Sequence, residues 1–194
     1  MEYLAKELIA RIKQLKDFKT IPEDHWIIGI RNPEDHPDKF DDKFYLMKGQ
    51  ECIMDTSGTT NPGVKILKGG FKSYNKYGAA IVEADRIYYN LWAYGLHRGR
   101  TPALRQIGAA ITIYRDGDCD GKSEEIGRRT SGYYGINFHP DQRNVNAEDK
   151  ESTRIGGWSA GCQVCDKIDD YNKFIEATKD QKRVTYAILN EFSI

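Results

Sequence analysis

The sequence predicts a mainly β fold of the α+β class, a β-sandwich or β-barrel with one helix at the N-terminus and one near the C-terminus. Short apolar runs rich in Ile, Tyr, Phe and Trp are separated by Gly, Pro, Asn and Asp, which is typical of strands joined by turns. Only two segments repeat their apolar residues at the helical spacing of three or four. A chain of 194 residues is of the length that usually forms one domain.

The first element is an amphipathic helix within residues 1–20. Leu4, Leu8, Ile12 and Leu15 share one helical face, with Lys and Glu opposite. We expect this face to pack on the helix's own domain rather than on a partner or a membrane surface. Residues 21–194 then form the single domain that carries the chemistry.

The strands follow in order from residue 25. The strand-like runs cover residues 25–30, 43–47, 51–56, 79–94, 108–117, 133–139 and 182–192. Pro and Gly in residues 31–42 and 56–63 predict loops there. A second helix is expected over 166–180, opened by an acidic N-cap, because four apolar residues lie on one side of it: Ile168, Tyr171, Phe174 and Ile175.

Charge and hydropathy exclude two classes of partner. The 29 basic and 29 acidic residues balance, so no global field favours nucleic acid. The basic segment 96–106, with Arg98, Arg100 and Arg105, is expected to be a solvated loop, in which one arginine can meet a substrate carboxylate. No apolar run is long enough for membrane insertion. The N-terminus has no Sec signal pattern, so synthesis in the cytoplasm is expected, and nothing specifies an oligomeric state.

Residues 157–165, GWSAGCQVC, raise the question of whether Cys162 is a nucleophile or a core residue. A catalytic cysteine needs an environment that favours the thiolate and a base within reach. Small residues from Ser159 to Gly161 precede the cysteine, and a helix is expected to begin near Asp166. We therefore expect a tight turn that presents the thiol together with backbone N–H groups aimed at a substrate oxygen.

His139 is the candidate general base. It ends the alternating run GINFH, in which Ile136 and Phe138 face one side while Asn137 and His139 face the other. A histidine at a strand end is held at the rim of a sheet, where loops build sites. Asn137, Asp141 or a main-chain carbonyl is expected to orient the imidazole. The other histidines are expected at the surface: His25, His36 and His97.

A strand that ends in His, followed by Ser-x-Gly-Cys, resembles the catalytic signature of the YkuD-type L,D-transpeptidase domain. The matching positions are His139, Ser159, Gly161 and Cys162, and 23 residues separate the histidine from the cysteine, somewhat more than is usual in the family. Residues 55–63 more loosely resemble the turns that precede the site in that family. The resemblance covers about residues 40–190 and implies an L,D-transpeptidase-like β-sandwich or barrel acting on peptidoglycan stem peptides.

Two positions depart from the family pattern. Ala160 stands where members commonly have a second histidine, and Val164 stands where they have an arginine or asparagine. Gln163 and Arg154 are the nearest polar candidates to replace those contacts. These departures leave transpeptidase, carboxypeptidase and endopeptidase activities open, along with a non-catalytic wall-binding or virion module on the same fold.

The resemblance implies a cofactor-free acyl transfer on a peptide that carries meso-diaminopimelate or lysine. His139 takes the thiol proton, Cys162 attacks the carbonyl, and the N–H groups of Gly161 and Cys162 hold the oxyanion. Three aromatic residues flank the site in sequence and form either walls for the stem peptide or part of the core: Tyr133, Tyr134 and Trp158. The missing signal suits a phage lysin or secreted antibacterial effector that acts in the periplasm or cell wall.

Two further patterns are weaker candidates for metal sites. Cys162 and Cys165 form C-x-x-C, which binds zinc or cycles as a dithiol, but only His139 is an obvious third ligand. The run DGDCDG from Asp116 to Gly121 matches the first six positions of a calcium loop, although the twelfth position is Gly127 rather than Glu. We therefore expect no metal at the cysteines and an acidic hairpin turn at residues 116–121, with weak calcium binding as the alternative.

Overall fold

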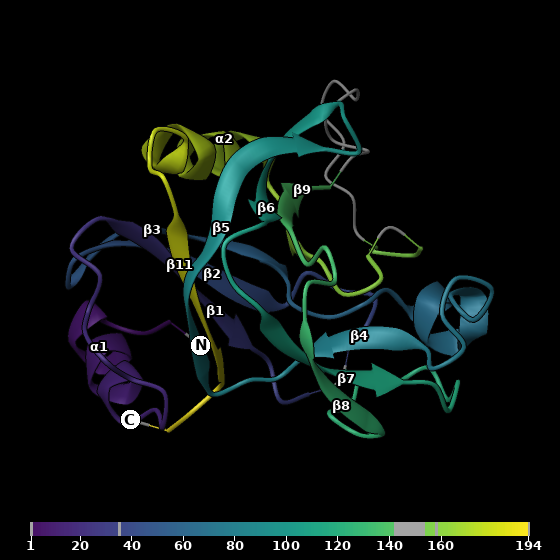
Figure 1. The fold of residues 1–194 in the computed structure, drawn as a ribbon. Helices are drawn as coiled ribbons and strands as arrows, with labels where there is room; N and C mark the ends of the chain where they lie inside the picture. The colour runs from purple at the N-terminus through teal and green to yellow at the C-terminus, as the bar shows by residue number, and fades with distance from the viewer. Residues whose placement is uncertain (1, 35, 142–153, 158, 194) are drawn as a thin grey trace.

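An eight-stranded barrel and a small three-stranded sheet make up the body of the protein (Figure 1). The structure, a computed structural model, describes residues 2–34, 36–141, 154–157 and 159–193. Around the closed barrel the strands run β1 (His25–Arg31), β11 (Val184–Asn190), β5 (Arg86–His97), β6 (Thr101–Gln106), β9 (Phe138–Pro140), β10 (Gln163–Cys165), β3 (Glu51–Thr59) and β2 (Asp42–Lys48). The second sheet consists of β4 (Ala79–Val82), β7 (Ile111–Asp116) and β8 (Arg128–Gly132), and a short π-helical turn spans Ile66–Gly70.

The predicted mainly β fold of the α+β class is confirmed. Both expected helices are present, α1 (Ala5–Lys13) before the strands and α2 (Ile168–Thr178) after the cysteine motif. Most strand pairs in the barrel are antiparallel, but β1 with β11 and β9 with β10 run parallel. No helix in the described part of the chain combines the length and the apolar character that a membrane span requires.

Aromatic side chains fill the barrel. The rings of Trp92 and Tyr186 stack at 4.4 Å, and Phe138 lies edge-on to Phe44 at 5.1 Å. The helix α2 lies over one end of the barrel (Figure 1) and adds Phe174, whose ring centroid is 5.5 Å from that of Phe138. Because these groups are fully buried, β9 is fixed from the inside by its own phenyl ring.

The helix α1 packs on the outside of the barrel, as its periodicity predicts. Leu8, Ile9 and Ile12 are buried in a cluster that also contains Trp26 of β1. Leu4 is an exception, since it precedes the first helical turn and is 60% exposed. Its backbone N–H donates to the Glu7 carboxylate at 2.7 Å, so this position begins the helix rather than filling the core.

Several boundaries differ from those the sequence predicts. Residues 56–59, expected in a loop, extend β3 because they pair with both β2 and β10. The run 79–94 is divided into β4 and the first part of β5 by a turn in which Asp85 has a φ of 53°. Strands β6 and β8 were not predicted, because their alternating polar residues resemble a solvated loop when their partner strands are not known.

Candidate active site

His139 lies in β9, and Cys162 directly precedes β10, the parallel neighbour of β9. In the register of β9 with β10, Gln163 is level with Phe138 and Val164 is level with His139. Gln163 N–H donates to the Asn137 carbonyl oxygen at 2.9 Å, which places Cys162 beside Asn137 at the start of β10. Val164 pairs with His139, and Cys162 lies two positions before Val164 on the neighbouring chain segment. The Cα atoms of Cys162 and His139 are therefore about 8 Å apart, a distance that their two side chains can span.

The two side chains also project from the same face of the sheet. Level residues on adjacent strands point the same way, and successive residues alternate. Phe138 and Gln163 point into the barrel, where Phe138 is fully buried and the Tyr186 hydroxyl donates to Gln163 Oε1 at 2.5 Å. Cys162 and His139 therefore occupy the outer face.

A tight turn places Cys162 at the edge of that face. Ser159 Oγ donates to the Cys162 carbonyl oxygen at 2.8 Å and accepts the Gly161 N–H at 3.2 Å. Gly161 has a φ of +132°, and a Cβ there would lie 2.4 Å from the Ala80 carbonyl oxygen, so only glycine fits. Since Ser159 and Gly161 are buried, their role in this structure is to hold the turn.

This turn differs from the expected one in two respects. The strand β10 separates Cys162 from α2, which begins at Ile168, so the N-terminus of α2 does not directly follow the thiol. The Gly161 N–H, expected in the oxyanion hole, is donated to Ser159. The Cys162 N–H has no hydrogen-bond acceptor among the described residues and is the donor that is open to a substrate oxygen.

The tautomer of His139 is fixed by the backbone. Its Nδ1 lies 2.8 Å from the Pro140 carbonyl oxygen, which only accepts, so Nδ1 carries the proton and Nε2 carries the lone pair. Of the three orienting groups considered from the sequence, the main-chain carbonyl holds the ring. An imidazole in this state is a proton acceptor at Nε2, as a general base requires.

His97, expected at the surface, is part of the site. Its ring stacks on that of His139 with centroids 4.4 Å apart. Gln106 N–H donates to Asn137 Oδ1 at 2.9 Å, which leaves the Asn137 amide nitrogen to donate to His97 Nδ1 at 3.1 Å. Asn137 thus orients His97 rather than His139. No local pattern identified His97, because β5 meets β9 only through β6.

Gln106 is a second residue that sequence reasoning missed. Its Oε1 accepts the N–H groups of Tyr134 and Ile136 at 2.9 and 3.1 Å, and its Nε2 donates to the Gly132 carbonyl oxygen at 2.9 Å. The residue is 6% exposed. One buried amide therefore fixes the segment that leads into β9 and so positions Asn137 and His139.

The electrostatics keep both reactive groups neutral. Burial raises the pKa of the Cys162 thiol, although the Asn137 N–H and the charge of Arg98 lower it. The thiol donates to the Gly135 carbonyl oxygen at 3.5 Å, and no hydrogen bond joins it to His139 within the described residues. Burial, with the His97 and Arg98 charges, lowers the pKa of His139 to about 4. The resting pair is thus thiol and neutral imidazole.

The expected substrate-binding residues lie in different places. Gln163 points into the barrel, because strand alternation turns it away from Cys162. Tyr133 is 63% exposed, whereas Tyr134 is half-buried against the core and 5.3 Å from the Arg115 guanidinium. Arg154 is exposed. Trp158 lies outside the described residues.

The arrangement of the sulfur atoms does not support zinc binding or dithiol cycling by the C-x-x-C motif. Cys165 lies three positions after Cys162 along extended chain, so the two side chains face opposite sides of the sheet. Cys165 is fully buried in the barrel core, its pKa is raised to about 12 by burial, and all four cysteines are free thiols. Within the described part of the chain, neither sulfur joins His139 in a group of three potential metal ligands.

Acid is expected to destabilise the protein through His139. The folded-state pKa of about 4 lies below the ordinary value of 6.5, so between these values the unfolded chain binds more protons than the folded one. The free energy of unfolding should therefore fall by about 3 kcal/mol as the pH drops from about 6.5 to 4, with no contribution above that range. Urea titrations of the wild type and His139→Gln measure the difference in slope.

His25→Gln, at the start of β1, is the control for replacing a histidine outside the site. If wild type and His139→Gln lose the same free energy across this range, the imidazole is not held neutral by its surroundings.

The raised thiol pKa predicts slow alkylation of Cys162 at neutral pH. Only the thiolate reacts with iodoacetamide, so the rate should rise about tenfold per pH unit between about pH 7 and 9. Peptide mass spectrometry after timed quenching measures each cysteine separately. Cys165, fully buried, should stay unmodified in the same samples and serves as the internal control. A rate that has already reached its plateau near pH 7 would contradict the prediction.

Comparison with protein-family models, with curated proteins and with solved structures finds no match to this chain. The fold and the candidate site together define a β-barrel with a cysteine and a histidine on one outer face of adjacent parallel strands.

Proposed function

We propose that the protein processes peptidoglycan stem peptides by cysteine-dependent acyl transfer, as an L,D-transpeptidase, L,D-carboxypeptidase or endopeptidase. The observation that carries the proposal is the placement of Cys162 and His139 on one face of β9 and β10, with Nε2 of the imidazole free to accept a proton. The reaction type rests on this geometry. The substrate class rests on the resemblance of His139 and the Ser-x-Gly-Cys motif to the YkuD-type domain.

The reaction starts from the neutral pair. As Cys162 Sγ bonds to the peptide carbonyl carbon, its proton passes to His139 Nε2, and the Cys162 N–H donates to the developing oxyanion. The C–N bond then breaks, and the leaving amine takes the proton from the imidazolium. Water or an acceptor amine attacks the thioester, its proton passes through the same nitrogen, and the thiol is restored.

Arg98 is the residue best placed to recognise a charged substrate. It follows β5 at the hairpin turn to β6 and is exposed, and its charge acts on both Cys162 and His139. Stem peptides carry carboxylates near the scissile bond, and an arginine whose charge acts on the thiol can pair with such groups. Tyr133, which is exposed on the same segment that leads into β9, offers an apolar wall for the peptide.

The test is incubation with purified disaccharide tetrapeptides that contain meso-diaminopimelate or lysine, followed by mass spectrometry. Loss of the terminal D-Ala identifies a carboxypeptidase, and cross-linked dimers identify a transpeptidase. A sample whose Cys162 has been alkylated at alkaline pH should show neither product. If unmodified protein leaves both substrates and cross-linked muropeptides unchanged across about pH 6–9, the catalytic proposal fails.

A non-catalytic wall-binding module is the second candidate, and one observation favours it. The thiol donates to the Gly135 carbonyl oxygen at 3.5 Å rather than to the imidazole. A module of this kind would sediment with intact peptidoglycan without altering it, and Cys162→Ala would bind as well as the wild type. The catalytic proposal places the site of action in the periplasm or cell wall, as does this alternative.

A further inference from the structure

The loop between β7 and β8 gathers three carboxylates outside the Cys162 site. Asp118, Asp120 and Glu124 each bring one carboxylate oxygen within 4.8 Å of the others. Asp116, the last residue of β7, begins this loop, and the Glu124 N–H donates to its Oδ2 at 3.2 Å. Like charges this close repel one another unless a cation lies among them.

Asp116 provides an independent observation that points to a cation at this loop. Its side chain is only 3% exposed, and its Oδ1 is buried without a hydrogen-bond partner in the described part of the chain. A buried carboxylate oxygen without a partner is costly, and a metal ion would satisfy it.

The spacing of these residues matches a calcium loop. Asp116, Asp118 and Asp120 hold the first, third and fifth positions, and Gly121 holds the sixth with a φ of 90°. Glu124 stands at the ninth, and the main-chain carbonyl of the seventh residue would supply a further oxygen. Side-chain oxygens also accept backbone N–H groups along the loop, as when Asp118 accepts from Asp120 at 3.1 Å.

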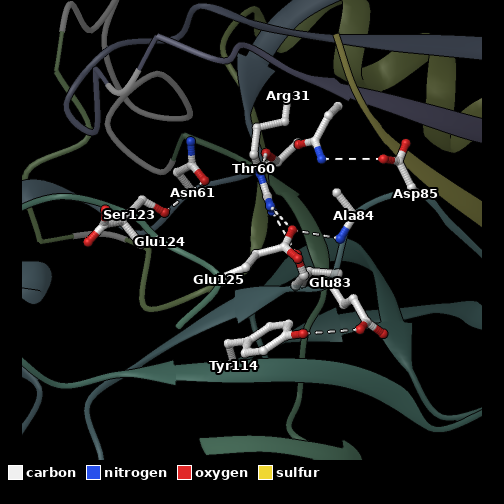
Figure 2. A network of polar contacts seen from close by, with 12 residues as sticks. Arg31, Thr60, Asn61, Glu83, Ala84, Asp85, Tyr114, Ser123, Glu124 and Glu125 are labelled. Atoms are coloured by element: carbon white, nitrogen blue, oxygen red, sulfur yellow. Dashed lines mark hydrogen bonds and ion pairs between the residues drawn. The ribbon is translucent and has the colours of Figure 1, made fainter. Parts of the chain in front are cut away.

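The second half of the loop lacks the glutamate that binds the ion at the twelfth position of a calcium loop, and it is held instead by hydrogen bonds to the rest of the protein. Glu125 accepts from Arg31 and from the Ala84 N–H, both at 2.8 Å, and Ser123 donates to Asn61 at 2.9 Å (Figure 2). These contacts fix the main chain on both sides of Glu124. The loop is therefore shaped without a metal, which lowers the ordering cost of binding one.

We infer that this loop binds one Ca²⁺ through the carboxylates of Asp116, Asp118, Asp120 and Glu124. Calcium suits it better than magnesium, because Ca²⁺ accepts six to eight oxygens in flexible geometry, whereas Mg²⁺ demands a near-ideal octahedron and keeps its waters. Without a bidentate glutamate the affinity should fall in the weak range, with a dissociation constant of about 10⁻⁴ to 10⁻³ M. The Lys122 ammonium, 3.7 Å from Asp120, would be displaced by the ion.

Calorimetry on chelator-treated full-length protein, titrated with CaCl₂ and separately with MgCl₂, tests the inference. We expect one Ca²⁺ site per chain, at least tenfold weaker Mg²⁺ binding, and a higher melting temperature in about 5 mM CaCl₂. Asp118→Asn with Asp120→Asn should weaken Ca²⁺ binding at least tenfold without unfolding the chain, since both side chains are exposed.

The matched control is Glu51→Gln with Glu176→Gln, which removes two exposed carboxylates elsewhere and should bind Ca²⁺ as the wild type does. Absence of both heat and thermal stabilisation up to about 10 mM CaCl₂ would overturn the inference. Equal weakening in the control pair would also overturn it, because binding would then follow total charge. Mg²⁺ binding as tight as Ca²⁺ would refute the assignment to calcium.

Discussion

Cys162→Ala is expected to abolish turnover of disaccharide tetrapeptide, lowering kcat/KM by at least about 10³-fold. The alanine removes the only atom that can form the thioester, while the turn held by Ser159 and Gly161 is unchanged. Cys162→Ser should be nearly as inactive, because a hydroxyl is harder to deprotonate than a thiol and the imidazole, with its pKa near 4, is a weak base. Quantitation of released D-Ala or cross-linked dimer measures the loss.

Two further variants define what the loss means. His139→Gln is expected to lower kcat/KM by about 10²–10⁴-fold, and the double variant should be no worse than Cys162→Ala, because the two residues act as a unit. Cys52→Ala, a half-buried cysteine on β3, should keep wild-type activity. An active Cys162→Ala enzyme would show that the nucleophile lies elsewhere.

Arg31→Ala is expected to lower the free energy of unfolding by about 3–5 kcal/mol, the largest stability effect that we predict. The guanidinium is buried where the end of β1 meets three other segments (Figure 2). It donates to Glu125 at 2.8 Å, to the Val82 carbonyl at 2.9 Å and to the Thr60 hydroxyl at 3.1 Å. Removing it leaves Glu125 without its cation and the other two acceptors without their donor.

The network continues beyond the arginine, which increases the expected loss. The Thr60 N–H and hydroxyl donate to Asp42 at 2.6 and 2.7 Å, so the same threonine links Arg31 to a fully buried carboxylate. The nearby Arg31 charge favours the ionised form of Asp42, although burial raises its pKa overall. Loss of the arginine therefore weakens the attachment of β1 both to β2 and to the loop between β7 and β8.

Urea denaturation measures the effect, with a surface ion pair as the control. Lys43→Ala breaks a 2.8 Å pair with Asp55 that is partly exposed, and it should cost less than about 1 kcal/mol. Glu125→Gln, which keeps an acceptor for the Ala84 N–H, should cost less than Arg31→Ala. Equal small losses in all three variants would show that the buried network does not stabilise the fold.

The sequence determined those features that depend on residues close together in the chain. The alternation in GINFH placed Phe138 and His139 on opposite faces, and the helical spacing identified α1 and α2. The resemblance of residues 116–121 to a calcium loop was also apparent from the sequence, because that pattern is defined by carboxylates and a glycine at fixed positions along one short segment. The reactive residues can also be recognised from the sequence, because a thiol is a potential nucleophile and an imidazole a potential base wherever they lie in the fold.

Only the tertiary structure decided which groups meet at the site. His97 stacks on His139, and Gln106 holds the segment before β9, although they lie 42 and 30 residues from their partners along the chain. Strand β10, too short to have a periodicity of its own, lies between Cys162 and α2 and turns Gln163 into the barrel. Strand pairing across the barrel sets these contacts, and a local pattern carries no information about which strands become neighbours.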